Sequence, residues 1–167
     1  MSDLTLSIAP ERLEDASAIE RLNERAFGPG RFARTAYRLR EGAAHDLALS
    51  FVARVGTLLV GSNRMTPIEC GHARALLLGP LTVEPAFRSR GIGRALIEAS
   101  LGAAREAEHT LSLLVGDEPY YGRLGFKRVP FGKLAMPGPV DPARLLACEL
   151  KPGALEGLSG AIVALRE

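Results

Sequence analysis

LLLGPLTVEPAFRSRGIGRALIEASLGAARE, residues Leu76–Glu106, carries the clearest structural signals in this chain. Its first part, Leu76 to Val83, is an apolar run of strand length that stops at Pro85, too short for a helix. Its last part, from Arg94 to Leu101, is rich in strong helix formers and is interrupted only by Gly102. The stretch therefore predicts a strand, a basic glycine-containing loop and a helix, in that order.

The loop in the middle of this stretch has the chemistry of a phosphate site. The first turn of a helix leaves backbone N–H groups without partners and carries the positive end of the helix dipole, which together favour an anion. Gly91 and Gly93 lack a Cβ and permit a close approach to the main chain. The arginines of the loop add positive charge; they are Arg88, Arg90 and Arg94. We expect a diphosphate as the ligand.

Spacing separates three kinds of phosphate loop. A P-loop needs a Lys and a Ser or Thr after its last glycine, but Arg94-Ala95 follows Gly93. A dinucleotide fingerprint needs a small residue where Leu96 stands and an acidic residue near Leu113, so that interpretation is weak. The residues do match Arg/Gln-x-x-Gly-x-Gly/Ala, a third kind of loop, at Arg88 to Gly93.

With this loop and its surroundings, the chain resembles the GCN5-related N-acetyltransferases (GNAT), in which the corresponding loop holds the pyrophosphate of acetyl-CoA. A second apolar strand follows at Leu111 to Val115, and Tyr121 stands four residues before Gly125-Phe126, as a tyrosine does in that family. The resemblance extends from Leu76 to Val129. Glu149 to Leu155 further resembles a branch of uncharacterised bacterial-type predicted N-acetyltransferases.

The resemblance implies an α/β fold with a mixed, mostly antiparallel sheet, a splayed central strand pair and flanking helices. Gly79-Pro80 interrupts the central strand, and Pro80 has no N–H for a neighbouring strand, which is consistent with a splay or a bulge there. Unpaired backbone groups at the splay would bond the pantetheine arm of CoA as a strand would. The residues expected to bind acetyl-CoA are Leu81, Thr82, Val83, Arg88, Ser89, Arg90, Gly91, Ile92, Gly93 and Arg94.

Acetyl transfer to an amine needs a donor to the thioester oxygen, a proton for the departing thiolate and a base for the amine. A backbone N–H near Leu81 can serve the oxygen, and Tyr121 is the expected general acid, whereas the adjacent Tyr120 is expected to point to the opposite side and to pack rather than react. The central strand has no carboxylate to act as the base. Four residues elsewhere in the chain are candidate bases by chemistry only: Asp46, Glu69, His72 and Glu118. The alternative is a chain of water molecules that carries the proton.

The function that follows is direct transfer of the acetyl group of acetyl-CoA to a primary amine. The alternative is a protein of the same fold that binds CoA as a sensor or partner, without acceptor chemistry; the retained Tyr121 favours the enzyme. The acceptor, a small molecule or a peptide amine, should be selected by Phe27 to Arg40 and Pro130 to Pro142, in which no motif is recognisable. Because these segments contain few acidic residues, a highly cationic acceptor is disfavoured.

Composition fits one domain spanning residues 1–167: the chain is 47% hydrophobic and 24% charged, as expected for a globular protein with a core. The net charge of +2 does not suggest a nucleic-acid partner, and no apolar run approaches membrane-spanning length. Cys70 and Cys148 are too far apart to suggest a metal site and are expected to be core thiols. We expect a cytoplasmic enzyme without a metal, and a homodimer is the expected assembly for a small enzyme of this kind.

Periodicity predicts the remaining elements. A strand from Leu4 to Pro10 is followed by a helix from Leu13 to Ala26 and a shorter one from Arg31 to Arg40. Strands at Leu47 to Val55 and Leu58 to Ile68 should form a hairpin around Gly56-Thr57, and Gly71 should begin the next turn. After the central stretch, the proline-rich segment from Pro130 to Pro142 is expected to be an irregular loop, followed by a strand near Leu145 to Leu150.

Overall fold

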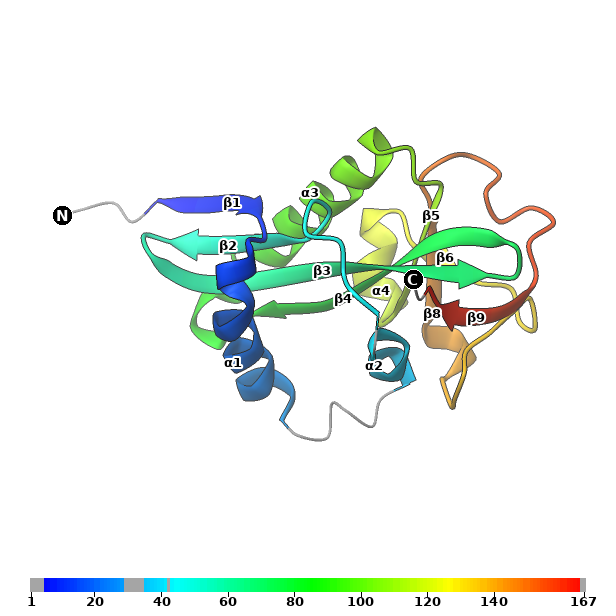
Figure 1. The fold of residues 1–167 in the computed structure, drawn as a ribbon, viewed down its shortest axis with the longest axis horizontal. Helices are drawn as coiled ribbons and strands as arrows, with labels where there is room; N and C mark the ends of the chain where they lie inside the picture. Colours follow the sequence, from blue (N-terminus) through cyan, green and yellow to red (C-terminus); the bar gives the residue numbers. More distant parts are fainter. Residues whose placement is uncertain (1–4, 29–34, 42, 166–167) are drawn as a thin grey trace.

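The computed structural model describes residues 5–28, 35–41 and 43–165. Their strands form one sheet in the order β1-β2-β3-β4-β5-β8-β6, with β9 beside the end of β3 and β7 beside β9. Figure 1 shows α1 crossing in front of this sheet and α3 lying behind it. The strands are β1 Leu6–Pro10, β2 Phe51–Val55, β3 Leu58–Cys70, β4 Ala73–Val83, β5 Leu111–Val115, β6 Lys127–Arg128, β7 Leu134–Ala135, β8 Leu145–Glu149 and β9 Gly160–Ala164. The α-helices are α1 Ala16–Phe27, α2 Thr35–Arg40, α3 Ile92–Glu106 and α4 Glu118–Tyr121.

The central strands β4 and β5 are splayed. They are parallel neighbours, but they pair only where Leu76 faces Ser112 and Leu77 faces Leu113. Further along β4, the described partner is β3 alone, which runs antiparallel to it up to Val83. The register between β3 and β4 shifts opposite Gly79-Pro80. The predicted mixed, mostly antiparallel sheet with a splayed central pair is therefore confirmed.

Alternation along β4 supplies the core on both faces of the sheet. Leu77 packs in one apolar cluster with Leu39 of α2, whereas Leu76 packs in another with Ile97 and Leu101 of α3. All five of these side chains are at most 3% exposed. A strand buried on both faces needs a continuous apolar run, and this explains the sequence at the start of β4.

Several predicted boundaries are corrected by the structure. Residues 47–49 form a turn and not the start of β2, because the Asp46 side chain accepts a hydrogen bond from the backbone N–H of Ala48, and its carbonyl accepts one from Ser50. Helix α3 continues through Gly102 to Glu106. Residues 31–34 of the expected second helix lie outside the described residues. The hairpin at Gly56-Thr57 is confirmed.

The last third of the chain holds a strand that sequence reasoning missed. β9 pairs antiparallel with the end of β3, from Ile68 opposite Ala164 to Cys70 opposite Ile162. It also pairs with β7, a two-residue strand inside the segment expected to be an irregular loop. The β-branched pair Ile162-Val163 was the available signal.

Both cysteines are buried core thiols, as predicted. Cys70 is fully buried and Cys148 is 3% exposed, and neither forms a disulfide. Burial raises the pKa of Cys70 to about 12 and also raises that of Cys148. Within the described part of the chain, no helix has the length and apolar character to cross a membrane, and no group of three or more potential ligands could hold a metal ion.

Candidate active site

The glycine loop between β4 and α3 presents free backbone N–H groups. Gly91 caps α3 in a left-handed conformation (φ 79°), and Ser89 also has a positive φ of 64°. The first bond within the helix runs from the N–H of Ala95 to the carbonyl of Gly91, at 3.0 Å. By helix geometry, the N–H groups of residues 92–94 are left without a helical partner. No heavy atom lies within 4 Å of the position of a Cβ at Gly91, so the main chain there is open to a ligand.

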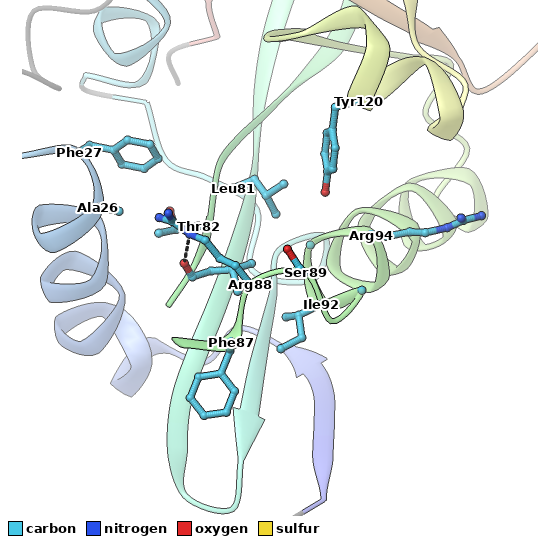
Figure 2. Close-up of a pocket in the computed structure, with 13 residues that line it drawn as sticks. Ala26, Phe27, Leu81, Thr82, Phe87, Arg88, Ser89, Ile92, Arg94 and Tyr120 are labelled. Atoms are coloured by element: carbon cyan, nitrogen blue, oxygen red, sulfur yellow. Dashed lines mark hydrogen bonds between the residues drawn. The ribbon is translucent and has the colours of Figure 1, made fainter. Parts of the chain in front are cut away.

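A cavity of about 410 Å³ lies over this loop and the end of β4 (Figure 2). Nine of the ten predicted acetyl-CoA residues line it, and Arg90 is the exception. Phe27 of α1 and Tyr120 of α4 line two further sides of this cavity (Figure 2). The structure thus brings together, at the splay, residues from β4, the loop and the first turn of α3.

The side chain of Thr82 is directed away from any ligand by a bond inside the protein. Its hydroxyl donates a hydrogen bond to Oδ1 of Asn23 at 2.5 Å, and both residues are 3% exposed. Asn23 belongs to α1, so this buried pair ties α1 to β4. The Thr82 hydroxyl is therefore engaged inside the protein and does not face a ligand in the cavity.

The three arginines of the loop have different surroundings. Nε of Arg88 donates to the carbonyl of Val83 at 3.3 Å, so its guanidinium lies over the end of β4 (Figure 2). Arg90 stacks on the ring of Phe87, 5.5 Å from its centroid, outside the cavity. Arg94 pairs with Glu98 one turn along α3, at 2.8 Å. Each side chain is exposed, so an anionic ligand can compete for it without a burial cost.

Tyr120 points to the opposite side from Tyr121, as predicted, and there it lines the first cavity, to which sequence reasoning had not assigned it. Its hydroxyl is directed toward the start of α3 (Figure 2). A Cβ at Gly93 would lie 2.8 Å from that hydroxyl. The absence of a side chain at Gly93 is therefore what gives Tyr120 its place.

A second cavity, of about 600 Å³, lies on the other side of Leu81. Leu81 and Phe27 line both cavities, so the two meet at the splayed strand. Residues 139–141 form part of its wall, as expected for the proline-rich segment. The other residues that line it include Asn23, Thr35, Ala36, Tyr37, Arg40, Leu78, Gly79, Pro80, Leu114, Val115, Gly116, Asp117, Tyr121 and Arg144.

Tyr121 lines the second cavity. Its ring packs on Gly116, where a Cβ would lie 2.5 Å from Cε2, and makes an edge contact with Phe126 at 6.1 Å between centroids. Burial, with Tyr120 and Asp117 adding to it, raises the pKa of Tyr121 to about 12. The hydroxyl therefore keeps its proton at neutral pH, as a general acid must.

None of the four candidate bases lines either cavity. Asp46 holds the turn before β2, and Glu118 accepts a bond from Arg128 at 3.2 Å. Glu69 lies within β3 opposite Val163, and His72 is an exposed residue of the turn after β3. The carboxylates that do line the second cavity are Asp117 and Asp141, which sequence reasoning did not consider as bases.

Comparisons with known proteins agree with this geometry. Residues 46–128 match the family model of the acetyltransferase (GNAT) domain. The uncharacterised N-acetyltransferase YhbS of Escherichia coli K12 is 25% identical over 150 residues, which cover 89% of each chain. The crystal structure of E. coli YhbS in complex with CoA superposes with a TM-score of 0.83, over 99% of this chain and 92% of that one.

A second solved structure is more similar in sequence. A GNAT family acetyltransferase of Brucella melitensis, in complex with acetyl-CoA, is 30% identical and has a TM-score of 0.61, with 86% of this chain and 96% of that one covered. Residues 46–128, which the family model matches, contain the splayed strands and the glycine loop described above. The chain belongs to the GCN5-related N-acetyltransferase (GNAT) family, whose enzymes use acetyl-CoA as cosubstrate.

Proposed function

We propose that this protein moves the acetyl group of acetyl-CoA directly to a primary amine. The observation that carries the proposal is that two cavities meet at Leu81, on the strand edge freed by the splay. One contains the glycine loop and the other contains Tyr121. Such a pair of cavities can hold a donor and an acceptor at the same time.

The residues of the first cavity fit acetyl-CoA. Gly91 leaves open space beside the free N–H groups of α3, which suits a diphosphate. The edge of β4 from Leu81 to Val83 has no described strand on its β5 side, so its backbone groups can bond the amides of the pantetheine arm. Arg88 can pair with a phosphate.

When bound, acetyl-CoA supplies an acetyl thioester that an amine can attack. In our proposal, the backbone N–H of Leu81 donates to the thioester oxygen as charge develops on it. Tyr121 donates its proton to the sulfur as the carbon–sulfur bond breaks. The amine loses its own proton to solvent in the second cavity, since no candidate base assigned from the sequence lies there.

Acceptor-dependent release of thiol tests this function against simple CoA binding. The protein would be incubated with acetyl-CoA and a panel of primary amines, and free thiol and acetylated amine would be counted together. We expect equal amounts of both with at least one amine. Tight binding of acetyl-CoA without acceptor-dependent thiol release would instead support the alternative, a binding protein of this fold.

A further inference from the structure

The wall of the second cavity includes the guanidinium of Arg40. Arg40 is the last residue of α2, and its Nη2 atom lies 3.5 Å from the carbonyl oxygen of Leu78, to which it donates. A Cβ at Gly79 would lie 2.8 Å from the same nitrogen. The side chain is therefore held against the irregular part of β4, in the wall of the proposed acceptor cavity.

Within the described part of the chain, no carboxylate balances this charge. The Nε atom of Arg40 is buried and has no hydrogen-bond partner, and no described acidic group lies within ion-pair distance. The cavity is also lined by Arg144, which pairs with Asp117 at 3.6 Å, and by Asp141, which accepts a bond from the N–H of Ala143 and keeps its negative charge. The formal charges of these described residues sum to zero, and Arg40 is the cation among them that has no carboxylate within ion-pair distance.

A purely structural role, in which Arg40 only bonds to β4, would leave most of its N–H donors without a partner. One bond of 3.5 Å to a carbonyl engages one of the five N–H donors, and burying an unpaired cation is costly. Burial lowers the pKa of Arg40 to about 10, with Tyr37 opposing the shift and Arg64 adding to it, so the group is still charged at neutral pH. A planar fork of donors in a cavity matches a carboxylate or phosphate.

We propose that Arg40 binds an anionic group, a carboxylate or a phosphate, on the amine that is acetylated. This inference rests on the proposed function and names its substrate class. Gly79, which Arg40 touches, is two residues from Leu81, where the cavities meet, so the guanidinium lies near the place at which the proposed donor and acceptor meet. The amine and the anion therefore belong to one small molecule with a short spacer.

Matched acceptors test the proposal by turnover. β-Alanine is compared with its amide, and phosphoethanolamine with ethanolamine, so that the two pairs distinguish a carboxylate from a phosphate. We expect a higher kcat/KM for the anionic member of at least one pair. In Arg40→Met, that preference should fall about 10- to 100-fold, while turnover of the neutral member falls far less.

Two further variants separate recognition from folding. Arg38→Met removes the same charge from an exposed position of α2 outside the cavity and should keep the preference. Arg40→Lys keeps the positive charge but lacks the forked pair of N–H donors, so it should recover part of the preference for the anionic acceptor. If the parent protein uses the neutral acceptors equally well, or if Arg40→Met slows both members of a pair equally, the inference is wrong and the proposed function still stands.

A binding measurement makes the inference independent of turnover. Calorimetry of the protein with CoA and N-acetyl-β-alanine, or with the amide of that compound, reports the anion site directly. Binding of the acid alone, lost in Arg40→Met, would support the site even if no amine were acetylated. In that case, the proposed function fails and the anion site stands. Equal binding of acid and amide would overturn the site.

Discussion

Tyr120 and Tyr121 are adjacent in the chain, but they line different cavities. Their rings meet edge to face with centroids 4.8 Å apart, because the short helix α4 turns one toward the loop and the other toward Gly116. This division predicts different roles for two identical side chains. Tyr120 should act on acetyl-CoA affinity and Tyr121 on the chemical step.

Tyr121→Phe should slow the chemical step by roughly 10²- to 10⁴-fold with little change in acetyl-CoA affinity, because the change removes only the proton donor. Single-turnover kinetics would measure it, since product release cannot then hide a slower chemical step. The matched change Tyr120→Phe should instead appear in the dissociation constant of acetyl-CoA. If Tyr121→Phe reacts as fast as the parent, the thiolate takes its proton from another source.

The start of α3 is where the site depends most on backbone conformation. Gly91→Val should weaken acetyl-CoA binding severely, because Gly91 is left-handed at φ 79° and a branched side chain would occupy the open space beside the free N–H groups. The strain itself should cost only about 1–2 kcal/mol of stability. Calorimetry with acetyl-CoA, together with urea unfolding, would measure both effects.

Gly102→Ala provides the control within the same helix. Gly102 has no heavy atom within 4 Å of a Cβ and no positive φ, so alanine there should raise stability by roughly 0.5–1 kcal/mol and leave acetyl-CoA affinity unchanged. Unchanged affinity in a folded Gly91→Val variant would mean that the diphosphate does not bind at this loop.

A buried carboxylate links three segments that are distant in the sequence. Glu11, whose side chain is 1% exposed, accepts hydrogen bonds from Arg64 of β3 at 3.1 and 3.2 Å and lies 2.7 Å from Nε2 of His45. Burial alone would raise the pKa of Glu11, but the bonds from His45 and Arg64 outweigh it and lower the pKa below the ordinary 4.5.

This lowered pKa predicts how stability depends on pH. Because the unfolded chain takes up the proton more readily than the native state, the contribution of Glu11 is present above about pH 4.5 and is lost as the pH falls through the native pKa. Glu11→Gln should be less stable than the parent by on the order of 3 kcal/mol at neutral pH, and the difference should shrink in acid. Urea unfolding over a series of pH values would show this, whereas a constant difference would contradict it.

The sequence predicted well what is encoded locally, and poorly what depends on distant contacts. The glycine loop, the interruption of β4 and the spacing of Tyr121 lie within one continuous segment, where ligand and backbone requirements restrict neighbouring residues directly. Arg40 and Asn23 reach the site only because α2 and α1 pack beside β4, so no spacing in the sequence indicates them.

The buried thiols of Cys70 and Cys148 have a practical consequence for the enzymology. Thiol reagents react with the thiolate, and both groups are sequestered in the core with raised pKa values. In the folded protein both cysteines should remain unlabelled, so a colorimetric thiol assay of released CoA would have a low background. A slow rise in that background would report transient opening of the core, with labelling limited by how often the fold exposes these sulfur atoms.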